Sequence, residues 1–478
     1  MRRPAIVLAC ALALVLAACG GSEESSATGG ESAAAIAPGN ATAYVAVDTD
    51  LDSDQWQQAQ ELLDRFPGRE RLIGLIQEEL GQEDLTWEED LDPALGPETA
   101  VVVLGGENDA VVLTQPDDRA KLDALLAQLE EDGDETLARE IEDWTAIAET
   151  EAALDAFERG AEAGTLADDD TFQEAMGELP EDALVKAYAA GDELERAVTD
   201  ATGETTDSFT GGGRLVSLSL ALEAIDEGAK VSGTTRLEGG TQLEPYEPAL
   251  LDRVPDDALV VFAFRDLAQG LEQARSAEGV APAIAQLEQA LGVSVDDLTA
   301  LFAGESVVYV RTGTPLPEVT VLLDVEDAAA GMATLDRLAA RVESLLGATT
   351  GTADVDGVPA KYVDVQGIRV SYANLDGVLV VTSGVTGIRD AGEDGDKITD
   401  DERFTAAREA AGMGDTTNGL LYVDLKDSVP LIESLAALGD EQIPPEVSAN
   451  LAPLESFFFY GEQEGEVGRF GGILMIAE

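Results

Sequence analysis

The pattern of apolar and polar residues contains one short unit that occurs four times along the chain. Each unit opens with a turn rich in Pro or Asp, continues into an extended apolar run, and ends at an Asp or Ser that can cap a helix. The apolar runs are residues 42–47, 184–190, 259–264 and 419–423. Such runs bounded by turn residues predict β-strands, each followed by a helix.

The spacing of the four units predicts an internal duplication. The runs at 99–104 and 110–113 correspond to those at 305–310 and 319–323, and helices are expected after both pairs, at 117–130 and 326–346. Residues 166–172 and 398–404 also correspond. The sequence therefore predicts an α+β fold of two tandem homologous domains, residues 37–240 and 245–478, each an antiparallel sheet partly covered by helices.

Each predicted domain closes with a pair of long strands, at 214–224 and 229–237 and at 455–462 and 468–477. In the first of these, Leu218, Leu220 and Leu222 alternate with the small residues Ser217, Ser219 and Ala221. This alternation predicts a sheet with one buried face. Any apolar cavity is expected to lie against the small residues.

The first residues have the pattern of an export signal. Arg2 and Arg3 precede an apolar run at 5–18, which ends in Leu-Ala-Ala before Cys19. This ending is similar to a bacterial lipoprotein signal, which implies that residues 1–18 are removed and that Cys19 carries diacylglycerol and fatty acyl chains such as palmitate. Residues 19–36 are rich in Gly, Ser, Ala and Glu, so they predict a flexible linker. An ordinary secretory signal with an incidental Cys19 is the alternative.

These features predict a protein anchored to the extracytoplasmic face of the cell membrane. The whole chain carries a formal net charge of −68, from 96 acidic and 28 basic residues, and removal of the signal with Arg2 and Arg3 would make it −70. Such a surface repels nucleic acid and favours cations or basic partners. Solubility alone is the simpler explanation of the charge.

Catalytic chemistry has little support in the sequence. There is no histidine, and of the two cysteines Cys10 lies in the predicted signal and Cys19 at its end. General bases of the usual kind and Ser-His or Cys-His nucleophile pairs are therefore absent. Gly-x-Ser-x-Gly, Ser-x-x-Lys and phosphate-binding Gly-Lys motifs are also missing. We expect a non-enzymatic protein without a cofactor.

A calcium site was considered at Asp48, Asp50, Asp52 and Asp54, which alternate along a predicted strand-to-helix connection. A calcium-binding loop that starts at Asp48 would require Gly at its sixth position and Glu at its twelfth. The residues there are Ser53 and Ala59, so helix capping is the better interpretation. The acidic residues at 393–396 and 400–402 predict a solvated loop. No metal ligands are assigned.

Several motifs together resemble one family. These are the Leu-Ala-Ala-Cys19 ending, the helix at 55–59, the Phe66-Pro67-Gly68 break and the Asp-Asp-x-x-Phe elements. They are similar to actinobacterial lipoproteins that carry domain of unknown function 3352. The resemblance covers nearly all of the chain after the signal, and it implies no known activity, cofactor or catalytic residue.

Three functions were weighed. An anchored interaction or scaffold protein of the cell envelope is favoured, with an envelope protein as its partner. The alternative is a carrier for a lipid or other apolar ligand, suggested by the strongly apolar strand at 457–460. An enzyme is the third. The sequence leaves the partner, the ligand and the oligomeric state open.

Overall fold

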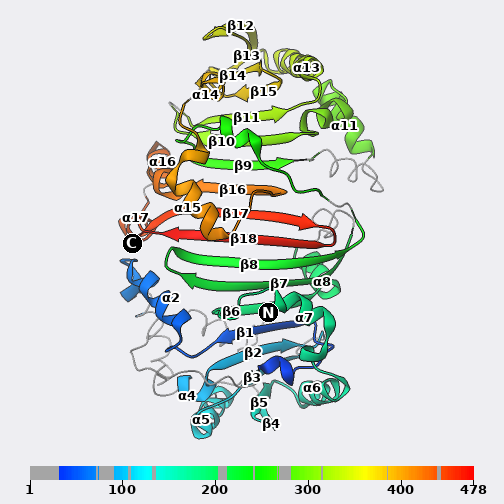
Figure 1. Ribbon diagram of the computed structural model, residues 1–478, viewed down its shortest axis with the longest axis vertical. Helices are drawn as coiled ribbons and strands as arrows, with labels where there is room; N and C mark the ends of the chain where they lie inside the picture. Colours follow the sequence, from blue (N-terminus) through cyan, green and yellow to red (C-terminus); the bar gives the residue numbers. More distant parts are fainter. Residues whose placement is uncertain are drawn as a thin grey trace.

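The computed structural model describes residues 32–71, 74, 91–105, 109–131, 136–202, 213–240, 243–265, 267, 281–313, 316–384, 386–393, 395–438 and 443–477. These residues form one long antiparallel sheet with helices on both of its faces and along its sides (Figure 1). The α+β class and the antiparallel arrangement predicted from the sequence are confirmed. The predicted signal peptide and Cys19 lie outside the described residues.

The sheet has 18 strands. They are β1 (Ala43–Asp48), β2 (Glu98–Val103), β3 (Ala110–Thr114), β4 (Leu137–Ile141), β5 (Trp144–Ala148), β6 (Val185–Ala190), β7 (Arg214–Ile225), β8 (Gly228–Glu238), β9 (Val260–Arg265), β10 (Glu305–Arg311), β11 (Glu318–Asp324), β12 (Thr349–Val355), β13 (Val358–Val365), β14 (Ile368–Leu375), β15 (Val378–Thr382), β16 (Gly419–Asp424), β17 (Leu454–Glu464) and β18 (Val467–Ile476).

The helices vary widely in length. The α-helices are α2 (Asp54–Asp64), α4 (Asp92–Leu95), α5 (Arg119–Glu131), α6 (Glu151–Ala163), α7 (Asp170–Gly177), α8 (Gly191–Thr202), α11 (Ala281–Leu291), α12 (Val295–Thr299), α13 (Ala328–Leu346), α14 (Thr386–Gly392), α15 (Glu402–Ala411), α16 (Leu425–Leu438) and α17 (Pro445–Leu451). The 3-10 helices are η1 (Ala33–Ala35), η3 (Leu166–Asp168), η4 (Ala249–Arg253), η5 (Ala300–Phe302) and η6 (Ile398–Asp400).

The two halves of the chain share one strand order. In the first half the order is β5-β3-β2-β1-β6-β7-β8, and in the second it is β15-β11-β10-β9-β16-β17-β18. This is the arrangement that a duplication predicts. The second half adds a hairpin, β12–β13, at its outer end. The proposed limits of the two repeats remain a prediction.

The halves do not form two separate sheets, because β8 pairs with β18 along most of its length. The register runs from Arg236 opposite Val467 to Gly228 opposite Met475. The last strand of the first half, β8, therefore lies next to the last strand of the second half, β18. This pairing makes the sheet continuous across both halves (Figure 1). The sequence had predicted the strands but not this joining of the two sheets.

One face of the sheet is covered by helices and contains the two main cores. In the first half, the ring of Phe172 from α7 packs edge-on against Tyr44 and Tyr188. In the second half, the ring of Phe404 from α15 packs edge-on against Tyr422 and also against Phe458. We call this side of the sheet the helix-covered face.

The local sequence explains why both helices start where they do. Asp169 accepts a hydrogen bond from the Phe172 amide at 2.8 Å, and Asp401 accepts one from the Phe404 amide at 2.8 Å. A side-chain acceptor at this position satisfies a free amide of the first helical turn. The repeated Asp-Asp-x-x-Phe element is therefore a helix cap followed by a core aromatic residue.

The predicted linker is shorter than the sequence suggested. Ala33 and Ile36 are buried in the first core, and η1 packs beside η3. The Ala33 amide donates to the carboxylate of Glu98 at 3.0 Å. Residues 33–36 therefore belong to the folded part of the chain, and extending the linker to residue 36 was wrong. Small side chains gave these residues a linker composition although they pack closely.

Within the described ranges, none of the helices combines the length and the apolar character that crossing a membrane requires.

Candidate functional site

The opposite side of the central strands is apolar, and we call it the apolar face. The strands involved lie in the order β1, β6, β7, β8, β18, β17, β16 and β9. Their register places one set of alternate residues on a common side of the sheet. The main members of this set are Ala43, Val45, Ala187, Ala189, Leu218, Leu220, Leu222, Val231, Val260, Phe262, Leu421, Val423, Phe457, Phe459, Phe470 and Leu474.

The apolar face remains partly open to solvent. Phe262 is 45% exposed and Phe459 is 36% exposed, and Leu218, Leu220 and Val231 are half-buried. Most folded proteins expose large apolar side chains singly, and a contiguous apolar patch of several hundred square ångströms marks an interaction site. The apolar face is therefore the strongest candidate for a binding site in the described part of the molecule.

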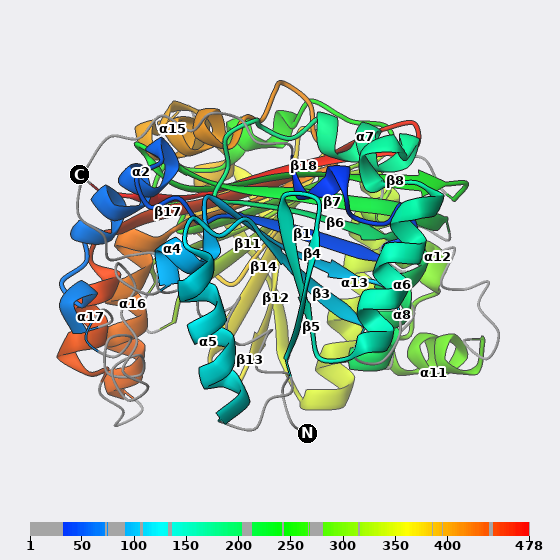
Figure 2. The same cartoon turned by 90° about the horizontal axis from the view of Figure 1, so that it is seen from below.

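Helices cover this side of the sheet at its two ends and, through Trp56 and Leu62 of α2, at the edge of the central strands near Val45 and Leu222. Leu122 of α5 packs with Val112 in the first half, and Ala339 of α13 packs with Val363 and Tyr372 in the second. Figure 2 shows α7 and α15 on one side of the central strands, and α5, α13 and α16 standing around the other side. The middle of the apolar face lies between these helices.

Charge is segregated between the two faces. The charged residues that the central strands carry in paired positions, such as Lys186, Arg236, Glu462 and Arg469, lie on the helix-covered face. The chain has 96 acidic residues, yet the central-strand residues that lie on the apolar face and are paired with a neighbouring strand are all uncharged. A ligand on the apolar face is therefore offered hydrophobic contact and almost no hydrogen bonds.

Two glycines set the shape of the apolar face where the halves meet. A Cβ on Gly233 would lie 2.3 Å from the ring of Phe470, and a Cβ on Gly472 would lie 2.9 Å from the ring of Phe459. Both rings therefore occupy the space beside these glycines on a neighbouring strand. Glycine is required at these positions because any side chain would lift the rings away from the sheet.

The structure reverses one expectation about β7. Ser219 is fully buried, and its hydroxyl donates to the Ala175 carbonyl at 2.8 Å and lies 2.9 Å from the hydroxyl of Thr234. The small residues therefore face α7, and the leucines form part of the apolar face. Any apolar cavity was expected against Ser217, Ser219 and Ala221, but α7 packs there instead, because small residues allow the helix to approach the strand closely.

The acidic loop after β1 is a helix start. Ser53 accepts a hydrogen bond from the Trp56 amide at 3.2 Å and donates one to Asp48 at 2.6 Å. Burial raises the pKa of Asp48 to about 6, against the effect of the hydrogen bonds from Ser53 and the Asp50 amide. Among the described residues, no group of three or more acidic or thiol side chains is arranged to hold a metal ion.

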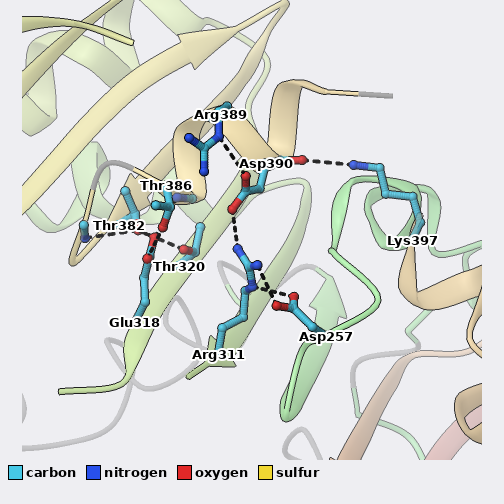
Figure 3. A network of polar contacts seen from close by, with 11 residues as sticks. Asp257, Arg311, Glu318, Thr320, Thr382, Thr386, Arg389, Asp390 and Lys397 are labelled. Atoms are coloured by element: carbon cyan, nitrogen blue, oxygen red, sulfur yellow. Dashed lines mark hydrogen bonds and ion pairs between the residues drawn. The ribbon is translucent and has the colours of Figure 1, made fainter. Parts of the chain in front are cut away.

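A dense polar network in the second half is structural (Figure 3). Glu318 accepts hydrogen bonds from Thr382 at 2.9 Å, from the Gly387 amide at 2.6 Å and from Thr386, and so caps α14. These contacts occupy the carboxylate and join β11 to α14.

In the same network, Arg311 forms ion pairs with Asp257, at 2.6 Å, and with Asp390. Asp390 also pairs with Arg389 at 3.2 Å. The network therefore ties the start of β9, the end of β10 and α14 together by mutually paired charges.

The described pockets lie away from the apolar face and are polar. One, of about 460 Å³, is lined by basic groups such as Arg253 and Lys397 and by acidic groups such as Asp252 and Asp356. Arg253 donates to the Leu375 carbonyl at 3.3 Å, so part of the lining is already engaged. Because basic and acidic side chains line this pocket together, its charge favours neither an anionic nor a cationic ligand.

Sequence reasoning missed the apolar face. The run at 457–460 was noted as strongly apolar, but Phe457 and Phe459 lie on one side of β17, and Phe458 and Tyr460 lie on the other. The signal that could have found the face is apolar residues on both sides of consecutive strands. The predicted lipid-bearing residue, Cys19, lies outside the described residues and cannot be placed relative to the face.

Comparisons with known proteins add little on function. No curated protein matches the chain. Among solved structures, crystal form IV of TP0453 matches with 15% identity and a TM-score of 0.26, over 45% of this chain and 75% of that one. Crystal form III of TP0453 matches with 12% identity and a TM-score of 0.24, over 48% and 94%. Scores this low carry no argument about fold or function.

A family model matches residues 145–459, from β5 to β17, and therefore spans parts of both halves. Its description is a protein of unknown function, DUF3352. This agrees with the domain of unknown function that the motifs resemble, whereas an actinobacterial lipoprotein origin stays a prediction. Because the match covers well over half of the chain, this protein belongs to the DUF3352 family.

Proposed function

We propose that this protein is a non-catalytic binding protein of the cell envelope that holds the acyl chain of a lipid on its apolar face. The observation that supports this function is the apolar face itself. It is a partly open surface of aligned Leu, Val, Ala and Phe residues, and none of its residues in strand-paired positions is charged. The anchor expected at Cys19 would place the protein next to a supply of lipid.

The chemistry of the apolar face favours an acyl chain over a protein partner. Protein interfaces usually contain about one hydrogen bond per 100–200 Å². The backbone groups of the central strands are already paired in the sheet, and Thr235 is a rare polar side chain on this face. An acyl chain makes no hydrogen bonds with water along its length, so it gives up none when it binds here. A partner protein would lose hydrogen bonds with water that the apolar face does not replace.

The dimensions also suit a lipid. Neighbouring strands lie about 4.8 Å apart, so the apolar face extends about 34 Å from β1 to β9. One leaflet of a bilayer has a hydrocarbon depth of about 15 Å, half of the core thickness. An acyl chain that lies across the strands is therefore shorter than the apolar face and can be covered along its whole length.

The binding test uses the full chain carrying Cys19→Ser, which removes the predicted lipid acceptor and allows work without detergent. A fluorescent long-chain fatty acid is titrated into this protein, and saturable binding is expected. Leu220→Glu places a charge in the middle of the apolar face and should weaken binding at least tenfold, since burying an unpaired carboxylate against the chain is unfavourable.

The matched control is Leu345→Glu, because Leu345 is 60% exposed on α13 and lies away from the apolar face. Leu345→Glu should leave binding unchanged, and both variants should keep the melting temperature of the parent. Absence of saturable binding by the parent protein would refute the proposed function. Equal losses in both variants would show that binding is nonspecific.

The proposed anchor has its own test. The wild-type chain should enter the detergent-rich phase of a detergent partition, because acyl chains on Cys19 add about 0.8 kcal/mol of membrane affinity per buried methylene group. The Cys19→Ser variant is acidic and should stay in the aqueous phase. Equal partitioning of the two proteins would exclude the lipid anchor and leave the binding test unaffected.

A further inference from the structure

A second apolar surface lies at the outer end of the sheet, in the second half of the chain. Leu345 and Leu346 at the end of α13 are 60% and 62% exposed, and Ile368 and Val370 at the start of β14 are 51% and 36% exposed. We call these four residues the apolar tip. Figure 1 shows α13 and β12 to β14 at this end of the molecule. Strands β10, β11 and β15 separate β14 from the apolar face.

The four residues of the apolar tip belong to one surface. On the neighbouring strand β13, Val363 pairs with Val370 and Val365 pairs with Ile368, so these four side chains lie on the same side of the sheet. Val363 and Val365 belong to the cluster that packs against α13, and so does Ala348, just beyond the end of this helix. The end of α13 therefore lies beside the start of β14.

The apolar stripe of α13 continues beyond the part of the helix that is packed. Leu335, Ala339 and Val342 pack against the sheet, and Leu346 follows at the same helical spacing but is exposed. Strand β14 changes in the same way, from the buried Tyr372 to its exposed first residues. The helix and the strand thus both present apolar side chains that no other part of the described chain covers.

The apolar tip also differs in charge from the rest of the protein. Residues 344–350 and 365–370, which contain it, include no acidic residue, although the chain has 96. Their one charged residue is Arg369, whose guanidinium carbon lies 4.1 Å from the centre of the Tyr362 ring and which pairs with Asp364 at 3.6 Å. Arg and Tyr side chains beside exposed apolar residues are typical of protein surfaces at a membrane interface.

The size and charge of the apolar tip suit a bilayer better than a protein partner. A stable protein interface buries about 800 Å² and roughly 20–30 residues on each side, far more than four side chains provide. A second copy of this chain would also bring a formal net charge of −68 against the same charge. A bilayer needs no matching surface, because a few apolar side chains can enter between its head groups.

We propose that the apolar tip inserts into the head-group region of a lipid bilayer with little surface charge. It would give the protein a membrane contact in addition to the anchor predicted at Cys19. The acidic residues elsewhere on the chain are repelled by anionic lipids, so the acid-free tip is the part that can approach a membrane closely. This proposal concerns a different surface from the proposed function and does not depend on a ligand at the apolar face.

The test uses residues 19–478 with Cys19→Ser, which keep every described element but carry neither the predicted signal nor an acyl chain. This protein should float with phosphatidylcholine vesicles in a density gradient. Ile368→Glu places a carboxylate in the apolar tip and should lower the vesicle partition coefficient at least fivefold, because inserting a charge among apolar groups is unfavourable. The matched control is Ile432→Glu on α16, where the residue is 55% exposed, and it should change partitioning less than twofold.

A second measurement detects insertion directly and does not rely on a loss of binding. Ile368→Trp should retain vesicle binding, because Trp favours the membrane interface. Its emission, after subtraction of the parent spectrum, should shift to shorter wavelength when vesicles are added. Ile432→Trp should show no such shift. Melting temperatures close to that of the parent should confirm that all four variants fold.

Three results would overturn this proposal. They are absence of flotation by the parent, equal losses in Ile368→Glu and Ile432→Glu, and a dimer in sedimentation that Ile368→Glu abolishes, since a second copy would then cover the apolar tip. Fatty-acid binding separates the two proposals. Ile368→Glu should leave it unchanged, so failure of the vesicle test leaves the proposed function standing.

Discussion

The two halves of this protein share one helix start on the helix-covered face and differ in side-chain size on the apolar face. On the helix-covered face, Phe172 and Phe404 occupy equivalent positions after equivalent aspartate caps, and each packs edge-on against a tyrosine of the following strand. On the apolar face, the first half presents Ala, Val and Leu where the second presents mostly Phe.

The difference follows from what each face must do. A closely packed core tolerates little change in volume, and both halves retain the packed pair of a helix phenylalanine and a strand tyrosine, although the buried Ser219 and Phe458 differ in size at another equivalent position. An open face has no such constraint, and its side chains can differ in size as long as they suit what they contact.

The largest expected effect is the difference in stability cost between removing a ring from the core under the helices and removing one from the apolar face. Phe404→Ala removes a fully buried ring and should lower the free energy of unfolding by about 3–5 kcal/mol, and Phe172→Ala should cost nearly as much. Phe459→Ala removes a ring that is 36% exposed and should cost clearly less, about 1–2 kcal/mol. Urea unfolding measures all three. A cost for Phe459→Ala as large as that for Phe404→Ala would mean that the apolar face is packed and closed.

The next effect concerns two equivalent buried carboxyls. Glu305 accepts a hydrogen bond from the Leu250 amide at 2.8 Å, as Glu98 does from Ala33. Burial raises the pKa of Glu305 to about 7 in spite of its backbone hydrogen bonds, and burial also raises that of Glu98.

Since the folded pKa of Glu305 lies above the unfolded one, its contribution to stability is full below about pH 4.5 and is lost as pH rises through 7. The wild-type protein should therefore lose stability from pH 5 to 8, and Glu305→Gln, which keeps the acceptor, should lose less, with a difference on the order of 2 kcal/mol. Unfolding curves at several pH values test this. A wild-type stability that rises over this interval would contradict the assigned direction.

A smaller effect tests whether the repeated helix caps are equivalent. Asp169→Ala and Asp401→Ala each remove the acceptor for a first-turn amide and should each cost about 1 kcal/mol. Asp169→Asn and Asp401→Asn retain an acceptor oxygen, so each should lower the free energy of unfolding by only a few tenths of a kcal/mol. Thermal unfolding is sufficient to compare the four variants. A cost confined to one of the two helices would show that the repeats have diverged in stability as well as in surface.

The smallest expected effect is that of metal removal. The acidic loop from Asp48 to Asp54 belongs to the first half, and its side chains are engaged with Ser53 and backbone amides. A chelator at fixed ionic strength should leave the melting temperature unchanged, because capping needs no ion. A drop of several degrees would identify this loop as a cation site that the second half does not share.

Much of the fold could be predicted from the sequence because its signals are local. The turn-initiated apolar runs predicted β1, β6, β9 and β16, the helices expected at 117–130 and 326–346 appear as α5 and α13, and the Asp-Asp-x-x-Phe elements start α7 and α15. The order of these elements also predicted two similar halves, and the two halves share one strand order. Each of these signals depends on neighbours within about ten residues, where backbone preferences and helix caps act.

The candidate site could not be predicted, because alternation along a strand does not say which side is buried. In β7, both sets of residues are uncharged from 215 to 222, so the alternation predicted one buried face without deciding which set lies on it. The structure buries Ser219, since a hydroxyl that finds two hydrogen-bonding partners permits a closely packed helix.

By itself, then, the sequence determined the elements, their repetition and the predicted anchor at Cys19. Only the tertiary structure decided that β8 pairs with β18, that two sheets become one, and that the apolar sides of both halves line up on a single open face. These features depend on pairing between residues more than two hundred positions apart. Such pairing is selected by the fit of whole surfaces, which no local pattern encodes.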